Sequence, residues 1–164
     1  MPGLNLALYL YGSKSLPESM TGSGTRLTHA QALNLLGAAD IRTYSSGNCS
    51  DKNNKRCTCL DGIRQSTIDG IIAFKKTSNC NIVITAGTEV GHAPGPYSHA
   101  NGYKLDIRMM QNVTHFIQTH FTFTGLRSLD QAAQYDDGKG NIYAQELHPG
   151  GRNDHWDITY FASE

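Results

Sequence analysis

Residues Ser98–Arg108, Ser-His-Ala-Asn-Gly-Tyr-Lys-Leu-Asp-Ile-Arg, place His99 and Asp106 seven residues apart across Gly102. Near the end of the sequence, Asp154-His155-Trp156-Asp157 supplies another histidine flanked by carboxylates. Zinc binds imidazole nitrogen and carboxylate oxygen, and a catalytic site uses three protein ligands and leaves a fourth position for water. We therefore expect His99, Asp106 and His155 to bind Zn²⁺. The alternative is that the two histidines only make local hydrogen bonds.

The segments before this stretch predict two helices. Thr28 and Gln31 form a capping-box pattern that starts a helix over 29–36, and Gly37 suits its end. Asp61 can cap a second helix over 62–76, whose apolar residues recur at helical spacing. Strands are expected at 41–44 and, because the residues are β-branched, at 81–85.

The segments after Gly87 are richer in strands. Gly87–Tyr97 contains prolines and glycines and predicts an irregular loop, and 103–107 predicts the strand that carries Asp106. A helix over 111–119 and strands at 121–123, 141–145 and 156–161 follow. Because helices come first and strands dominate later, we expect an α+β fold with a mainly antiparallel sheet, helices packed on one face and the zinc site on the sheet.

The overall composition excludes several classes of protein. Fourteen basic residues balance fourteen acidic ones, so the sequence lacks the positive charge typical of nucleic-acid binding. No apolar run approaches the roughly twenty residues needed to span a membrane. A chain of 164 residues is most simply a single domain, 1–164, that can bury its own core.

The four cysteines, Cys49, Cys57, Cys59 and Cys80, predict two disulfides in an exported protein. We favour the pairs Cys49–Cys57 and Cys59–Cys80 among the three possible pairings. A structural zinc site fits less well, because Cys-Thr-Cys lacks the gap of a zinc knuckle.

Export is also indicated by two possible glycosylation sites, at Asn48 and Asn112. The apolar run within 2–12 has neither the basic start nor the cleavage site of a signal peptide. We therefore expect a secreted, extracellular protein whose signal peptide is absent from this sequence.

The stretch His-Ala-Asn-Gly-Tyr-Lys-Leu-Asp-Ile resembles the SxHxxGxAxD segment of the zinc D-Ala-D-Ala carboxypeptidases and L-alanyl-D-glutamate endopeptidases of cell walls. The resemblance covers about residues 60–160, so 1–58 would be an N-terminal extension with a cysteine-pinned loop and 59–164 a peptidase-like core. The resemblance implies the active-site fold that lysostaphin-type peptidases share with the hedgehog signalling domain. The family's His, Asp and distant His fall on His99, Asp106 and His155.

Three positions depart from the family pattern. Tyr97 stands where the family has serine, and Glu89 stands where an arginine binds a substrate carboxylate. Arg152 occupies the usual position of the general base, three residues before the last histidine. The change at Glu89 favours an endopeptidase, or a substrate with an amine at that place.

Two carboxylates could replace the missing base. Asp154 is adjacent to His155, but neighbouring residues on a strand face opposite sides. Glu146 can return to the site if 147–151 bulges out, and we favour it slightly. Asp157 shares the strand face of His155, so it could orient that ring or be the ligand itself.

Other residues have weaker assignments. His92 could stabilise the oxyanion of a transition state or be a solvated loop residue, and Tyr97 could contact a glycan or a peptide.

We expect a secreted zinc metallopeptidase that cleaves peptidoglycan stem peptides through a metal-activated water, with no nucleic-acid partner. The main alternative is a catalytically silent, hedgehog-like metal-binding module with an extracellular binding or structural role. A small disulfide-stabilised toxin or inhibitor is a third, weaker alternative.

Overall fold

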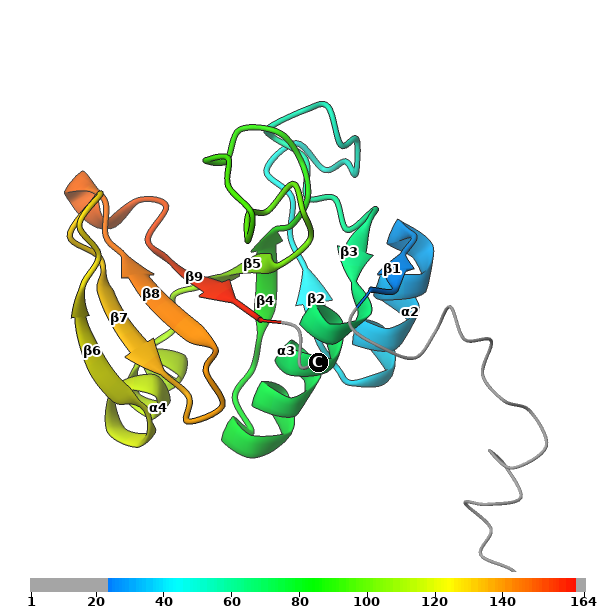
Figure 1. Ribbon diagram of the computed structural model, residues 1–164. Helices are drawn as coiled ribbons and strands as arrows, with labels where there is room; N and C mark the ends of the chain where they lie inside the picture. The colour runs from blue at the N-terminus through cyan, green and yellow to red at the C-terminus, as the bar shows by residue number, and fades with distance from the viewer. Residues whose placement is uncertain (1–23, 162–164) are drawn as a thin grey trace, which may run out of the picture.

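The computed structural model describes residues 24–161 and has an α+β fold (Figure 1). The apolar run within 2–12 and most of the loop expected over 13–26 lie outside these residues. In the part described, three α-helices accompany a seven-stranded, mostly antiparallel sheet and a separate two-stranded sheet. The helices are α2 (His29–Ala38), α3 (Gln65–Ser78) and α4 (Gln111–His120). The small sheet pairs β1 (Arg26–Leu27) with β3 (Ile63–Arg64).

The large sheet has the order β2-β4-β5-β9-β8-β7-β6. Its strands are β2 (Arg42–Thr43), β4 (Val83–Ala86), β5 (Lys104–Arg108), β6 (Thr122–Leu126), β7 (Ala133–Asp136), β8 (Ile142–Glu146) and β9 (His155–Thr159). Only the β2–β4 pair is parallel in this sheet. The last strand of the described chain, β9, therefore lies in the middle of the sheet, between β5 and β8.

Helix α2 begins as the sequence predicts. Thr28 accepts a hydrogen bond from the backbone of Gln31, whose side chain accepts one from the backbone of Thr28. The expected end at Gly37 is wrong, because the helix continues to Ala38 and the left-handed residue is Asp40 (φ 56°). Asparagine and aspartate tolerate this conformation better than most residues do, so Asp40 performs the turn expected of glycine.

Helix α3 begins three residues later than the sequence predicts. Residues Ile63 and Arg64 pair with β1 instead of joining the helix, so Arg64, not Asp61, is the N-cap. The predicted apolar stripe is buried at Thr67, Ile68, Ile71 and Phe74. Lys75 and Lys76 lie in the last turn, where positive charge complements the helix dipole.

The two faces of the large sheet differ in chemistry. Leu105, Ile107, Tyr143, Trp156 and Ile158 are buried on one face and belong to the core. Phe74 of α3 packs against Tyr143 with ring centroids 5.2 Å apart, and Trp156 donates its indole N–H to Thr114 of α4 (3.1 Å). Because side chains alternate along a strand, the polar residues between these positions point to the opposite face.

The disulfide prediction is half right. Cys49 and Cys57 form a disulfide, whereas Cys59 and Cys80 are buried free cysteines, so the second predicted pair is wrong. Cys80 precedes β4, and the carbonyl of Cys59 accepts a hydrogen bond from Thr88 beyond the end of that strand. The four strand residues alone span roughly 13 Å, more than the ~7 Å that a disulfide allows between Cα atoms.

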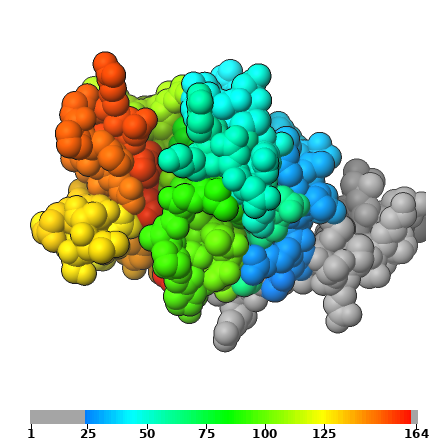
Figure 2. Space-filling view, turned by 90° about the horizontal axis from the view of Figure 1, so that it is seen from above, coloured from blue at the N-terminus to red at the C-terminus, as the bar shows by residue number. Residues whose placement is uncertain are grey.

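Loops at one end of the molecule lie over the polar part of the sheet. Seen from above, the loop before β5 (green) and the segment around the β8–β9 connection (orange) lie on either side of β9 (red) (Figure 2). No helix within residues 24–161 is long and apolar enough to cross a membrane.

Candidate metal centre

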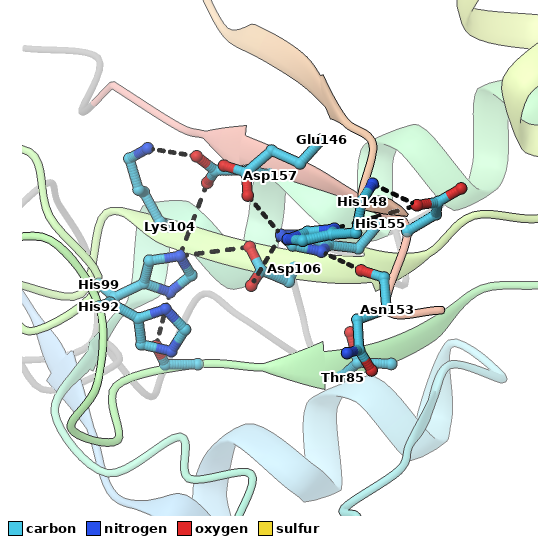
Figure 3. A network of polar contacts seen from close by, with 12 residues as sticks. Thr85, His92, His99, Lys104, Asp106, Glu146, His148, Asn153, His155 and Asp157 are labelled. Atoms are coloured by element: carbon cyan, nitrogen blue, oxygen red, sulfur yellow. Dashed lines mark hydrogen bonds and ion pairs between the residues drawn. The ribbon is translucent and has the colours of Figure 1, made fainter. Parts of the chain in front are cut away.

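The strand register gathers four titratable side chains on the polar face of the sheet (Figure 3). Asp106 of β5 lies opposite Asp157 of β9, and Glu146 of β8 lies opposite His155 of β9. Directly opposed residues share a face, as do residues two apart on one strand. Asp106, Glu146, His155 and Asp157 therefore point into the same space.

His99 reaches this space from the loop before β5. Its Nδ1 atom lies 2.7 Å from the carbonyl oxygen of Gly87 and donates a hydrogen bond there. Its Nε2 atom lies 3.2 Å from Asp106 Oδ1 and 3.6 Å from Asp157 Oδ1. A ring whose far N–H is held by a backbone carbonyl presents the other nitrogen as a ligand, which is how metal-binding histidines are usually oriented.

The approach of His99 depends on two glycines, Gly87 at a close backbone contact and Gly102 in a turn. At Gly87, a Cβ atom would lie 2.1 Å from the carbonyl oxygen of Cys59, so only glycine fits. Gly102 has φ +77°, and its N–H donates to the carbonyl of His99 (2.8 Å), which closes the turn into β5. Glycine adopts this left-handed conformation without a steric penalty.

His155 is oriented in the same way from the other side. Its Nδ1 atom donates to the carbonyl oxygen of Asn153 (2.8 Å). Its Nε2 atom lies 3.0 Å from Glu146 Oε2 and 3.5 Å from Asp106 Oδ2. Asp106 thus lies between His99 and His155, with one carboxylate oxygen facing each ring.

The two oxygens of Asp157 have different partners, since Oδ1 faces His99 and Oδ2 faces two cations. Its Oδ2 atom accepts hydrogen bonds from Lys104 (2.6 Å) and from Arg127 (2.8 Å). Within residues 24–161, the buried Oδ1 atoms of Asp157 and Asp106 have no hydrogen-bond partner. Two buried carboxylate oxygens that lack donors, beside an imidazole nitrogen, fit a bound cation.

His92, His99 and Asp106 form a His-His-Asp group that could hold a metal ion. One ligand atom from each lies within 4.8 Å of the others. The ring of His92 stacks on that of His99 at a centroid distance of 3.8 Å. From the sequence, His92 is expected either to stabilise a transition-state oxyanion or to be a solvated loop residue, and metal binding is missed because a histidine in a glycine-rich loop has no strand register to place it.

Glu89 points into the protein and does not line the cavity at this site. Its carboxylate accepts hydrogen bonds from the backbone of Cys59 (2.8 Å) and Gly87 (3.0 Å), and it contacts His92 Nε2 at 3.0 Å. Burial raises the pKa of Glu89, but the bonds from His92 and the backbone outweigh it and lower that pKa. Glu89 therefore fixes the loop that carries His92.

Glu146, rather than Asp154, lies beside His155. The hydrogen bond with His155 has the largest effect on Glu146 and lowers its pKa, so the carboxylate is ionised at neutral pH. Arg127, in the β6–β7 connection, also pairs with Glu146 and with Asp130. Asp154 Oδ1 instead accepts a hydrogen bond from the backbone of His148 (2.7 Å).

The carboxylates around His99 and His155 raise the pKa of both rings. Burial lowers the pKa of His99, but Asp106 and Asp157 outweigh this effect and raise it to about 10. Burial likewise opposes the charge on His155, whereas Glu146 and Asp106 raise its pKa to about 9. Burial raises the pKa of Asp157, but His99 and Lys104 hold it well below its usual range.

The site opens into a cavity of about 540 Å³. The cavity is lined by His92, Tyr97, His99, Lys104, Asp106, Arg127, Glu146, His155 and Asp157, together with neighbouring loop residues. Tyr97 is 49% exposed and its ring contacts Tyr103 and Phe161, so it lies at the rim of this cavity. Lys104, Arg127 and Asp130 were not singled out from the sequence, although the alternation of β5 places Lys104 on the face of Asp106.

A comparison with protein-family models, curated proteins and solved structures found no match to this chain.

Proposed function

We propose that this chain is a secreted zinc peptidase that cleaves peptidoglycan stem peptides. The observation that carries the proposal is the position of His99 Nε2 between two buried carboxylate oxygens, Asp106 Oδ1 at 3.2 Å and Asp157 Oδ1 at 3.6 Å, which have no partner other than this ring among residues 24–161. Imidazole nitrogen combined with carboxylate oxygen is a ligand set that suits zinc. The resemblance of Ser98–Arg108 to cell-wall peptidases supports the substrate class, and the Cys49–Cys57 disulfide supports export.

His99 and Asp106 would be the two common ligands of the metal. Three residues compete for the third position: His155 beside Asp106 Oδ2, Asp157 beside His99, and His92 stacked on His99. We favour His155 over Asp157, because imidazole binds zinc better than a second carboxylate does, and over His92, because the resemblance places the third ligand on a late strand. The distances favour His92 as the alternative, since its ligand atom lies within 4.8 Å of those of His99 and Asp106. Zinc in such a site polarises a carbonyl group and lowers the pKa of water toward 7.

Glu146 would be the general base of the reaction. Its Oε2 atom faces His155 and its Oε1 atom is held by Arg127, so the carboxylate is ionised and fixed in place. A base in this state takes a proton from the attacking nucleophile and passes it to the leaving amine. Lys104 and Arg127 neutralise Asp157, which keeps its free oxygen directed toward His99.

The test combines metal content with hydrolysis. Elemental mass spectrometry on the purified protein should find zinc at about one ion per chain, and His99→Ala should lose it. His115→Ala is the matched control, because His115 is exposed on α4. Purified peptidoglycan should release new amino groups with wild type and with His115→Ala, but not with His99→Ala.

One observation favours the silent metal-binding module as the second candidate. Arg152 stands at the family position of the general base, and Glu89, at the position of the anchoring arginine, is turned into the protein, so both family positions are altered. In that case zinc would bind with the same dependence on His99, but no bond in peptidoglycan would be cut. Absence of zinc from the wild-type protein would exclude both readings.

A further inference from the structure

A second cavity of about 570 Å³ adjoins the candidate metal centre. Its lining includes Tyr44, Arg108, Asp154, Asp106 and His155. The last two residues also line the first cavity, so both spaces meet at the same two side chains. A substrate that reaches the centre can therefore extend in two directions.

Arg108 supplies the positive charge of this second cavity. It lies on β5 directly opposite His155 and two residues beyond Asp106, so it shares their face of the sheet. Its guanidinium group lies over the ring of Tyr44, 5.1 Å from the centroid. Cation–π contact of this kind holds the guanidinium plane and leaves its N–H donors available.

The cations of the two cavities differ in their partners. Lys104 and Arg127, in the first cavity, both pair with Asp157. Arg108 has no carboxylate within 4.0 Å among residues 24–161. Asp154 shares the second cavity but accepts its hydrogen bond from the backbone of His148. Among the described residues that line the two cavities, Arg108 is thus a cation without a carboxylate partner.

We propose that Arg108 and Tyr44 form a carboxylate-binding subsite in the second cavity. A guanidinium group presents two parallel N–H donors that match the two oxygens of a carboxylate, which a lysine cannot do. The subsite rests on the proposed peptidase function and extends it, because it specifies a substrate with a carboxylate on the Arg108 side of the scissile bond. That carboxylate belongs either to the end of the peptide or to an acidic side chain.

The test is a titration followed by NMR on zinc-free protein, so that its outcome does not depend on the metal. N-acetylglycine presents a terminal carboxylate. The α-amide of N-acetylaspartic acid presents a side-chain carboxylate, and N-acetylglycinamide is the neutral control. The Arg108 Nε–H signal and the Tyr44 signals should shift with the carboxylates and stay unchanged with the amide. Whichever carboxylate binds more tightly identifies the source.

Variants give the decisive comparison. Arg108→Gln should weaken carboxylate binding roughly ten- to hundredfold, the usual effect of losing a charge-assisted pair. Arg42→Gln removes an exposed arginine of β2 that lines neither cavity and should leave binding unchanged. Equal binding by Arg108→Gln and wild type, or equal binding of the amide and the carboxylates, would overturn the subsite. If the wild-type protein binds these carboxylates but no zinc, the subsite stands and only the proposed peptidase function is overturned.

Discussion

The Nδ1 atom of His99 lies 2.7 Å from the carbonyl oxygen of Gly87, so the end of one strand orients the ring that faces Asp106 and Asp157. The position of that carbonyl depends in turn on the close approach of Gly87 to Cys59. Metal binding should therefore respond to a substitution at Gly87, which replaces no ligand.

Gly87→Ala should weaken zinc binding and destabilise the protein. The added Cβ would lie 2.1 Å from the carbonyl oxygen of Cys59, so the strand end must move and carry the partner of His99 with it. Overpacking of this kind costs about 1–3 kcal/mol. Urea unfolding and a zinc titration measure the two effects.

Gly37→Ala is the matched control, because nothing lies within 4 Å of its added Cβ and the residue is inside α2. Alanine in a helix interior should stabilise the protein by about 1 kcal/mol. Normal zinc binding by Gly87→Ala would show that this backbone contact does not orient the site.

The stability of the zinc-free protein should fall as the pH rises from neutral. Because the folded-state pKa values of His99 and His155 are raised to about 10 and about 9, their protonated forms stabilise the fold. This contribution is complete below about pH 6.5, the ordinary histidine pKa, and is lost as the pH rises through the two folded values. Chemical unfolding in the presence of a chelator measures it.

Zinc should reverse this trend. Because the ligands must lose their protons to bind, zinc affinity rises over the same pH range and protons are released on binding. Calorimetry in buffers of different ionisation enthalpy counts those protons, and His115→Gln should behave as wild type. Zinc binding without proton release would mean that neither histidine is a ligand.

Glu146→Gln and Asp154→Asn should separate the two candidate bases. Glu146 lies 3.0 Å from His155, whereas Asp154 is bonded to the backbone of His148. Loss of a general base lowers kcat by about 10²–10⁴-fold, so Glu146→Gln should lose that much activity while it keeps its zinc. Asp154→Asn should keep both its activity and its zinc. The reverse order of activities would assign the base to Asp154.

Removal of the Cys49–Cys57 disulfide should cost about 2.5 kcal/mol, because the loop that it closes is short. Urea unfolding of the double alanine variant measures the loss. Alkylation of the unreduced, unfolded wild-type protein should label Cys59 and Cys80 and leave the other pair unmodified. Labelling of none of the cysteines would contradict the pairing described above.

Local patterns predicted what local interactions determine. The capping box of Thr28 and Gln31 and the strand that carries Asp106 follow from spacing within a few residues. The sequence predicts a shared site for His99, Asp106 and His155 only through the motif and the family resemblance. Their separation in the sequence gives no distance.

Tertiary interactions determined the rest. The sequence 133–136, Ala-Gln-Tyr-Asp, lacks β-branched residues and was not predicted as a strand, yet β7 pairs with β6 and β8 on either side. The sequence predicts Ile63 as part of the second helix, but in the structure Ile63 pairs with Leu27 of β1 as a strand residue. Arg127 carries no sequence signal at all, because its importance comes from three carboxylates supplied by Asp130, Glu146 and Asp157.

The central position of β9 has a consequence for biosynthesis. Before residues 155–159 emerge, β2–β4–β5 and β8–β7–β6 are two partial sheets with no strand to join them. Asp106 and Glu146 acquire their shared neighbour, His155, only when this late strand inserts. The candidate metal centre therefore assembles only after nearly all of the described chain has been translated, so an incomplete polypeptide does not carry the complete group of side chains.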